Sequence, residues 1–244
     1  MKSQKQQVAL VTGSGKRLGR NIALALGERG FDVAVHYLTS NTGAKRTVKE
    51  IQDFGRKSAS FKADISNKRS VQQLVKKVIA EFGRIDLLVN NAAIFFDGEF
   101  EKISEAMWDI VLDTNLKSGF LCSQAVAPYM IKQGRGRIIN IASLGGIQPW
   151  GKRHLPYSVS KAGVIMLTRC LAKALAPKIL VNAIAPGTIE MDEPASTNSQ
   201  VSADTIPMKR YGTPEDITST VLFLATSANY ITGQIFSVDG GRSA

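Results

Sequence analysis

Tyr157 and Lys161 have the residue types and the spacing of a proton-transfer pair. At four positions apart, both side chains would lie on one face of a helix. A tyrosine has an ordinary pKa of about 10, and a nearby ammonium group lowers that pKa by stabilising the phenolate. A phenol tuned in this way can pass a proton to or from a substrate oxygen. Because the same spacing also occurs by chance on helix surfaces, the interpretation depends on what accompanies the pair.

The N-terminal part of the chain supplies a nucleotide-binding pattern. The apolar run 7–12 predicts a short buried strand, and Gly13, Gly15 and Gly19 follow it where a helix with Leu18 and Ile22 begins. Glycines at such a turn let the backbone approach a pyrophosphate, which the helix N-terminus attracts. A tight loop would explain the glycines alone. Their place between a strand and a helix favours a dinucleotide site.

Strands and helices alternate along the whole chain. Apolar runs predict strands near 7–12, 32–37, 57–63, 85–90, 136–142, 179–184 and 234–238, and the clearest helix covers 67–82. This alternation predicts an α/β fold, a Rossmann-type doubly wound parallel sheet of seven strands in a single domain, 1–244. The irregular segment at about 188–210 interrupts the alternation and predicts a substrate lid.

Composition excludes several classes of protein. The net charge of +11 comes from 31 basic and 20 acidic residues. The basic residues are dispersed, so a solvated surface or attraction of an anionic cofactor or substrate explains the charge, and we expect no nucleic-acid partner. No apolar run approaches the ~18 residues of a membrane span, so we expect no membrane partner. The start of the chain lacks the apolar stretch of a secretion signal.

The cysteine and histidine content predicts no metal site and a cytoplasmic protein. Cys122 and Cys170 have the spacing of neither a metal site nor a redox pair, so we expect two buried free thiols. The histidines, His36 and His154, are too far apart for a histidine-based metal site to be expected.

Taken together, the motifs resemble the short-chain dehydrogenase/reductase family over nearly the whole chain. In order, they are Thr12-Gly13…Gly19, Asp64, Asn90-Asn91-Ala92-Ala93, Asn115, Ser143, Tyr157…Lys161, Pro186-Gly187 and Asp239-Gly240-Gly241. The resemblance implies that Ser143 orients a substrate carbonyl and that Asn115 holds a water for proton relay. It also implies that Tyr157 is the acid/base, and that Lys161 binds the nicotinamide ribose and lowers the tyrosine pKa.

Elementary sheet geometry supports these roles independently. In an open α/β sheet the site lies outside the carboxyl ends of the strands, and both Ser143 and Asn91 follow predicted strands. Without the tyrosine–lysine pair, Ser143 would be interpreted as a turn residue and Asn115 as a helix residue that bonds the backbone.

The cofactor is predicted to be NADP(H). An acidic residue at the end of the second strand would bind the ribose hydroxyl of NAD, but residues 36–40 include no carboxylate. Lys16 and Arg17 in the turn, with the hydroxyls of Thr39 and Ser40, suit a 2′-phosphate instead. The predicted cofactor contacts are Gly13, Gly15, Lys16, Arg17, Leu18, Gly19, Tyr37, Thr39, Ser40, Asp64, Ile65, Asn91, Ala92, Ala93, Tyr157, Lys161, Pro186, Gly187 and Ile189.

Four features depart from the pattern of the family. Arg17 and Ala93 each replace a glycine, and Met191 stands where a threonine commonly contacts the nicotinamide amide. One extra residue separates Ser143 from Tyr157, so we expect the loop 146–156 to bulge.

Two branches of the family compete as models for the substrate. The chain resembles the β-ketoacyl-acyl-carrier-protein reductases through its catalytic residues and the segment 208–216, and the pteridine reductases through Arg17, His36-Tyr37 and Phe95. Pteridine reductases usually place aspartate at Ser143, whereas a serine donates a hydrogen bond to a ketone. The predicted function is therefore reduction of a small-molecule carbonyl to an alcohol, most like 3-oxoacyl-acyl-carrier-protein reductase, with an acyl carrier protein as a possible carrier. Predicted substrate contacts are Phe95, Ser143, Tyr157 and Met191.

Two alternative functions stay open. The first is reduction of a dihydropterin, in which Phe95 would stack on the pterin; a core or rim position explains Phe95 equally well. The second is a non-catalytic NADP-binding redox sensor, since a fold alone does not fix function. The complete catalytic set argues against the sensor.

Two long segments carry more apolar residues than one sheet face needs, which predicts a subunit interface. They are 104–132, with Met107, Trp108, Val111, Leu112, Phe120, Leu121 and Val126, and 157–175, with Val164, Leu167, Leu171 and Leu175. Burial by the lid and by each other is the alternative. The resemblance implies a homotetramer.

Overall fold

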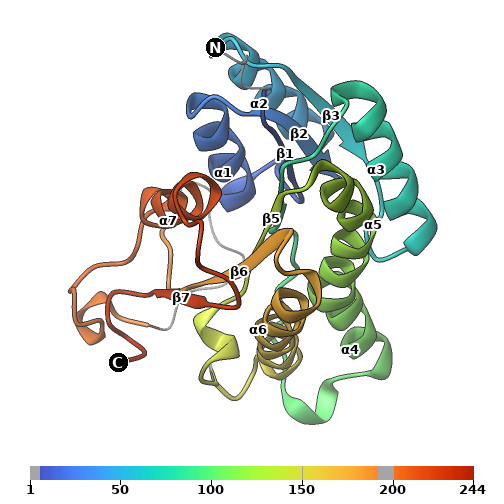
Figure 1. Cartoon of the computed structure of the whole chain (residues 1–244). Coiled ribbons are helices and arrows are strands. Elements are labelled where there is room, and N and C mark those ends of the chain that lie inside the picture. Colours follow the sequence, from blue (N-terminus) through green and yellow to red (C-terminus); the bar gives the residue numbers. More distant parts are fainter. Residues whose placement is uncertain (1–5, 150, 192–200) are drawn as a thin grey trace.

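A single seven-stranded sheet forms the centre of the molecule (Figure 1). The computed structural model describes residues 6–149, 151–191 and 201–244. All six strand pairings are parallel, in the order β3-β2-β1-β4-β5-β6-β7. The strands are β1 (Val8–Val11), β2 (Asp32–Tyr37), β3 (Ser58–Lys62), β4 (Leu87–Asn90), β5 (Gly136–Ile141), β6 (Ile179–Pro186) and β7 (Ile235–Val238). The predicted strands and the doubly wound Rossmann-type fold are confirmed.

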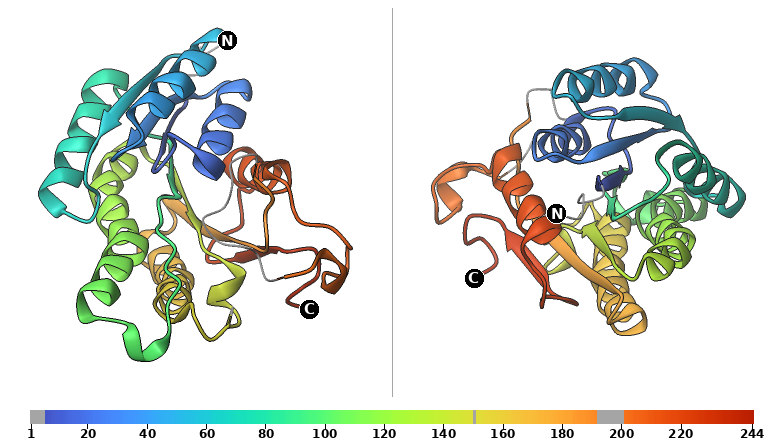
Figure 2. Two further views of the ribbon diagram at one scale, coloured as in Figure 1. Left: turned by 180° about the vertical axis from the view of Figure 1, so that it is seen from behind. Right: turned by 45° about the horizontal axis from the view of Figure 1, so that its top comes forward.

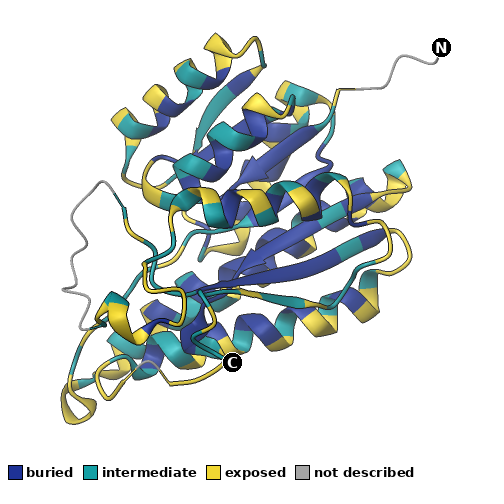
Figure 3. Ribbon diagram, turned by 90° about the vertical axis from the view of Figure 1, so that its left-hand side faces the viewer, coloured by how far each residue is buried: buried dark blue, intermediate teal, exposed yellow. Residues whose placement is uncertain are grey.

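Helices cover both faces of the sheet (Figures 1 and 2). Residues such as Ile22, Ile51 and Val221 bury α1, α2 and α7 on one face, and residues such as Leu74, Val126 and Ala172 bury α3, α5 and α6 on the other. The five inner strands β1, β2, β4, β5 and β6 are mostly buried, whereas the edge strands β3 and β7 are partly exposed (Figure 3). The helices are α1 (Arg17–Glu28), α2 (Asn41–Asp53), α3 (Lys68–Phe82), α4 (Glu105–Leu112), α5 (Ser118–Gln133), α6 (Leu155–Leu175) and α7 (Pro214–Thr226).

Helix α3 carries a sequence signal for its start, its buried face and its end. Its buried residues are Val71, Leu74, Val75 and Val78, which recur at helical spacing. The Asn67 side chain accepts a hydrogen bond from the Ser70 amide and caps the start. Gly83 ends the helix in the left-handed conformation, with φ of 76°. The predicted helix 67–82 is confirmed.

The order of the strands changes direction between β1 and β4, and this switch point positions the site. Chain connections on either side of it run to opposite edges of the sheet, which leaves a crevice at the carboxyl ends of the strands. The glycine-rich turn after β1 and Asn91 after β4 both lie at this edge.

A π-helical turn, Asp113–Lys117, separates α4 from α5 within the predicted segment 104–132. Such a turn admits one residue more than an α-helical turn and is frequent at functional sites. Asn115, at its centre, is buried at 4% exposure. The sequence periodicity did not reveal this interruption, because both flanking helices keep an apolar face.

The cysteine prediction is correct for one residue and wrong for the other. Cys122 is buried, and burial raises the pKa of its thiol to about 12. Cys170 is exposed, because it lies on the side of α6 that faces away from the sheet. Among the described residues no group of histidine, cysteine and acidic side chains could hold a metal ion, and no helix has the length and apolar character needed to cross a membrane.

Part of the predicted lid, 188–210, lies outside the described residues, which omit 192–200. On its near side Ile189 forms a β-bridge with Gly212. On its far side Ile206 is buried, and the Tyr211 hydroxyl donates to the carbonyl of Val201. A lid function stays a prediction.

Candidate active site

Three of the predicted catalytic residues meet where β5 ends and α6 begins. Ser143 follows β5, and Tyr157 and Lys161 lie in the first turns of α6. The hydroxyl of Ser143 is hydrogen-bonded to the phenol of Tyr157 and accepts from the Gly145 amide at 3.1 Å. Lys161 Nζ lies 5.8 Å from the centre of the Tyr157 ring. The tyrosine–lysine pair therefore shares one helix face, as its spacing predicted.

Burial sets the protonation of this pair. Lys161 is 3% exposed, and its Nζ donates a hydrogen bond to the carbonyl of Ile141 at 2.7 Å. Burial lowers the pKa of Lys161 to about 8. Burial also raises the pKa of Tyr157, and the hydrogen bond from Ser143 offsets only part of that rise. We predicted a tyrosine pKa lowered by Lys161. The net change in the Tyr157 pKa has the opposite sign, because desolvation disfavours the phenolate.

Asn115 connects the loop after β4 to the start of α6. Its Oδ1 accepts from the Ile94 amide at 2.8 Å, and its Nδ2 donates to the Ile94 carbonyl at 2.9 Å. The same Nδ2 donates to Ser160 Oγ at 3.1 Å, and Ser160 in turn donates to the carbonyl of Tyr157 at 2.7 Å. Both ends of the Asn115 amide are thus engaged in holding the backbone around Tyr157.

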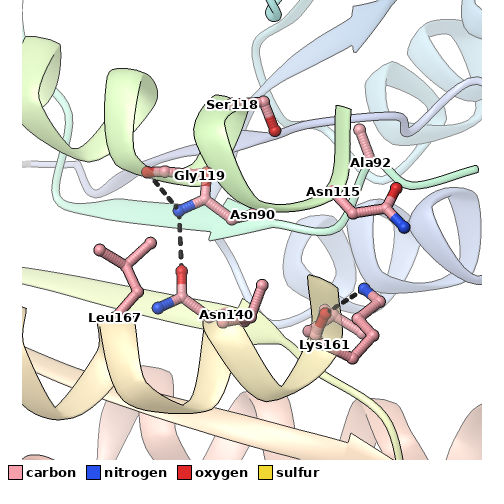
Figure 4. A pocket seen from close by; sticks show the side chains of 10 residues that line it. Asn90, Ala92, Asn115, Ser118, Gly119, Asn140, Lys161 and Leu167 are labelled. Atoms are coloured by element: carbon pink, nitrogen blue, oxygen red, sulfur yellow. Dashed lines mark hydrogen bonds between the residues drawn. The ribbon is translucent and has the colours of Figure 1, made fainter. Parts of the chain in front are cut away.

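A small polar cavity lies behind Lys161 and Asn115 (Figure 4). Asn90 and Asn140 face each other across β4 and β5, and Asn90 Nδ2 donates to Asn140 Oδ1 at 2.8 Å. The buried Oδ1 of Asn90 has no hydrogen-bond partner among the described residues. The space open to a water molecule is about 10 Å³, room for about one. Sequence analysis did not assign a role to either asparagine, although two amides at matching ends of apolar strands are a detectable signal.

The turn after β1 is shaped for an anion. Gly13 has φ of 67°, and a Cβ on Gly19 would come within 2.3 Å of the Gly13 carbonyl oxygen. Lys16 occupies the N-cap of α1 without capping it, and the first turn of this helix has no acidic residue. The first amides of α1 are therefore suited to a phosphate group. These residues fit the pyrophosphate of a dinucleotide.

A second anion-binding edge adjoins this turn. Lys16 and Arg17 are exposed, and Arg17 has φ of 50°, which explains why a glycine would suit this position. A Cβ on Gly43 would come within 2.0 Å of the Gly15 carbonyl oxygen, so the start of α2 lies directly against the turn. Ser40 is the N-cap of α2, makes no side-chain cap, and is followed by no acid in the first turn. Two cations, hydroxyls and two helix N-termini fit a 2′-phosphate.

The other predicted cofactor residues lie along the same edge of the sheet. Asn91 Nδ2 donates to the Thr12 carbonyl at 2.9 Å and joins β4 to the turn. Asp64 follows β3 and accepts from the Ser66 amide at 3.0 Å. Gly187 follows β6, and its amide donates to the Val238 carbonyl at 2.9 Å. Direct cofactor contacts by these residues, and by Leu18, Tyr37, Thr39, Ile65, Ala92, Ala93, Pro186 and Ile189, stay predictions.

The aromatic rings of Phe95 and His154 lie beside Tyr157, at the rim of the predicted substrate site. The Phe95 ring centre lies 4.7 Å from that of His154 and 4.9 Å from that of Tyr157. Arg153 bonds Asp97 at 2.6 Å, which ties the expected bulge in 146–156 to the loop after β4. Met191 is partly buried at the edge of the described residues, and its substrate contact stays a prediction.

Comparison with known proteins agrees with this geometry. The family model described as enoyl-(acyl carrier protein) reductase matches residues 13–243. A 3-oxoacyl-[acyl-carrier-protein] reductase from Synechocystis is 44% identical over 238 residues, which are 96% of each chain. Acetoin dehydrogenase from Salmonella typhimurium has a TM-score of 0.89 at 34% identity, over 97% of this chain and 95% of that one. A metagenomic blue fluorescent protein in complex with NADPH has a TM-score of 0.90 at 30% identity, over 98% of both chains.

The chain belongs to the short-chain dehydrogenase/reductase family. It is an NADP(H)-dependent oxidoreductase that acts on carbonyl and alcohol groups. Its similarity to 3-oxoacyl-[acyl-carrier-protein] reductases, which the sequence alone predicted, is confirmed.

Proposed function

We propose that the protein reduces the 3-keto group of an acyl thioester to a 3-hydroxyacyl thioester. The observation that carries this proposal is the hydrogen bond between Ser143 and Tyr157 at the carboxyl end of β5. Two hydroxyls that converge on one point can both donate to a single carbonyl oxygen. The resemblance to 3-oxoacyl-[acyl-carrier-protein] reductases supports a thioester carried on an acyl carrier protein as the substrate.

The residues divide the chemistry of reduction between them. Bound NADPH would supply the hydride that adds to the carbonyl carbon. Ser143 orients the carbonyl oxygen, and Tyr157 gives that oxygen its proton. The raised pKa of Tyr157 suits this direction, because the phenol holds its proton at neutral pH. Lys161 contributes positive charge that stabilises the phenolate left behind.

The cavity beside Lys161 supports a relay that returns the proton to Tyr157. It adjoins Asn115, Lys161 and the unpartnered Oδ1 of Asn90, so a water there would have polar partners on several sides (Figure 4). Because both ends of the Asn115 side chain are bonded elsewhere, its part in holding this water would fall to its backbone carbonyl in the π-helical turn.

The rim favours a substrate with an apolar portion next to the carbonyl. Phe95 packs against the rings of Tyr157 and His154, and Ile147 is exposed in the loop after β5. The same Phe95 ring favours the second candidate, a dihydropterin, which would lie against an aromatic face. Serine at 143 favours the ketone, because it donates to a carbonyl oxygen.

A panel of substrates tests the proposal. We expect NADPH oxidation, followed by absorbance, with an acetoacetyl thioester and not with dihydropterin or crotonyl thioester. The crotonyl thioester tests for reduction of a carbon–carbon double bond, because the matching family model is named for enoyl reduction. Turnover of dihydropterin alone would transfer the assignment to the second candidate. Tight NADPH binding without turnover of any compound in a broad carbonyl and pterin panel would favour a redox sensor.

We also propose a homotetramer in the cytoplasm. Four of the apolar residues predicted to form the interface, Val111, Leu121, Val126 and Val164, are buried within the chain. They are therefore not available to a second copy. Other apolar residues are available: Ile110 on α4, Phe120 on α5 and Met166 on α6 are 58%, 41% and 55% exposed. Apolar exposure across three helices on one side of the sheet supports an interface between copies.

A further inference from the structure

His36 lies in β2 against the glycine-rich turn after β1 and takes no part in the proton transfer proposed for Tyr157. It is 2% exposed. Its Nδ1 accepts a hydrogen bond from the Gly13 amide at 3.1 Å, and its Nε2 faces the Ala63 carbonyl at 3.0 Å. Because an amide can only donate and a carbonyl can only accept, these partners fix the neutral ring with its hydrogen on Nε2.

The same residue is bonded to the turn through its backbone. The Ser14 amide donates to the His36 carbonyl at 2.9 Å, and the His36 amide donates to Ser14 Oγ at 3.1 Å. Gly13 is held from the other side as well, since a Cβ there would come within 2.9 Å of Ala92 Cα. The turn therefore sits between His36 and the end of β4, and any shift of Gly13 would disturb the anion-binding amides of α1.

The imidazole thus spans two parts of the cofactor site. Gly13 belongs to the turn that fits the pyrophosphate, and Ala63 precedes Asp64 at the end of β3. We propose that His36 is a positioning residue: its neutral Nε2–H form holds these two segments in register, and NADP(H) binding is coupled to that form. This inference rests on cofactor binding and not on the identity of the carbonyl substrate.

Protonation of His36 Nδ1 would break its hydrogen bond with the Gly13 amide. A hydrogen on Nδ1 would face the Gly13 N–H, so two donors would meet and the turn would have to move. Burial lowers the pKa of His36, although the Ala63 carbonyl and the Asp64 carboxylate act to raise it. The charged residues of the segments that meet His36 are Lys62 and Asp64 at β3 and Lys16 and Arg17 in the turn, all of them exposed.

The test is the dissociation constant of NADPH as a function of pH, measured by cofactor fluorescence. Asparagine keeps an acceptor for Gly13 but does not titrate, so His36→Asn should bind within a few-fold of wild type at pH 7.5. Below the pKa of His36, wild-type affinity should fall by about tenfold per pH unit more than that of the variant, as one linked proton requires. Because wild type and His36→Asn are measured with the same ligand, NADPH, the titration of its 2′-phosphate affects both dissociation constants equally and does not contribute to their ratio.

Two further variants separate positioning from general stability. His154→Asn removes the other of the two histidines, which lies on the substrate rim, and should keep the wild-type pH dependence. His36→Leu leaves the Gly13 amide without an acceptor and should bind NADPH about tenfold more weakly than His36→Asn at every pH. Identical pH dependence in wild type and His36→Asn would overturn the proposal.

An independent measurement covers the case in which His36 variants do not fold. In the wild-type protein labelled at histidine, NMR should show His36 as the Nε2–H tautomer, with a pKa that falls further when NADPH is added. His154 serves as the internal reference. A His36 pKa unchanged by NADPH, or the Nδ1–H tautomer, would contradict the coupling.

Discussion

Lys161 Nζ lies 5.8 Å from the centre of the Tyr157 ring and bonds the Ile141 carbonyl at the end of β5. The ammonium group therefore lies beside Tyr157 in a desolvated position. Its one hydrogen-bond partner among the described residues is the Ile141 carbonyl, and it has little contact with water. Such an arrangement serves chemistry at the expense of stability, because a buried charge disfavours folding.

Replacing Lys161 by methionine should therefore stabilise the protein while it removes activity. A pKa lowered from 10.5 to about 8 corresponds to roughly 3 kcal/mol against the buried charged form, and loss of the bond to Ile141 offsets about 1 kcal/mol of the gain. We expect a higher melting temperature for Lys161→Met at pH 7. Met166→Leu, on the exposed side of the same helix, is the control and should change little.

The size of this stabilisation should decrease as pH rises. Between pH 8 and 10.5 the unfolded chain keeps the Lys161 proton and the folded protein does not, so wild-type stability rises with pH in this window. The gap between Lys161→Met and wild type should then narrow from pH 7 to pH 10. A gap that widens would show that the charge of Lys161 is favourable in the folded protein.

Activity should respond to the same titration. The ratio kcat/KM for NADPH reports the free enzyme, in which the pKa of Lys161 is about 8. We expect this ratio to fall as pH rises through about 8, because Lys161 then loses the charge that the phenolate needs. The raised pKa of Tyr157 adds no fall at lower pH. A profile that stays flat to pH 10 would argue against a cationic role for Lys161.

Cofactor choice should depend on Arg17. Its φ of 50° suits glycine, so Arg17→Gly introduces no backbone strain. Loss of a charge-assisted hydrogen bond to the 2′-phosphate, about 1.5–3 kcal/mol, should weaken NADPH by roughly ten- to a hundredfold and leave NADH nearly unchanged. Arg29→Gly, at the other end of α1, is the charge-matched control. Equal weakening of both cofactors would place Arg17 at the shared pyrophosphate.

The sequence pattern predicted the strands and the main helices because strands of a buried parallel sheet are continuous apolar runs, as in Val8–Val11. The proximity of Ser143, Tyr157 and Lys161 was predictable because Ser143 follows a strand and the other two share a helix face. Other features depend on contacts between distant segments. The π-helical turn at Asn115, the Asn90–Asn140 pair and the bonds of His36 join residues that local periodicity does not relate. The pKa of Tyr157 depends on burial, which spacing alone does not measure.

Assembly should depend on the exposed apolar residues of α5 and α6. Phe120→Glu combined with Met166→Glu places charges on residues that are 41% and 55% exposed in the chain. Light scattering should give four times the chain mass for wild type and a smaller mass for the double variant. Phe54→Glu, equally exposed at 43% but next to α2, should keep the wild-type mass. A monomeric wild type at micromolar concentration would exclude the interface.

The most direct test of the central claim is Tyr157→Phe, measured for both turnover and NADPH binding. The substitution removes only the hydroxyl that is bonded to Ser143. A positioned proton donor contributes about 10²–10⁴-fold, so kcat with an acetoacetyl thioester should fall by at least that factor while the Kd for NADPH stays within a few-fold. Tyr230→Phe, on a fully exposed ring, controls for the loss of a phenol. Turnover retained in Tyr157→Phe would contradict the assignment of Tyr157 as the proton donor.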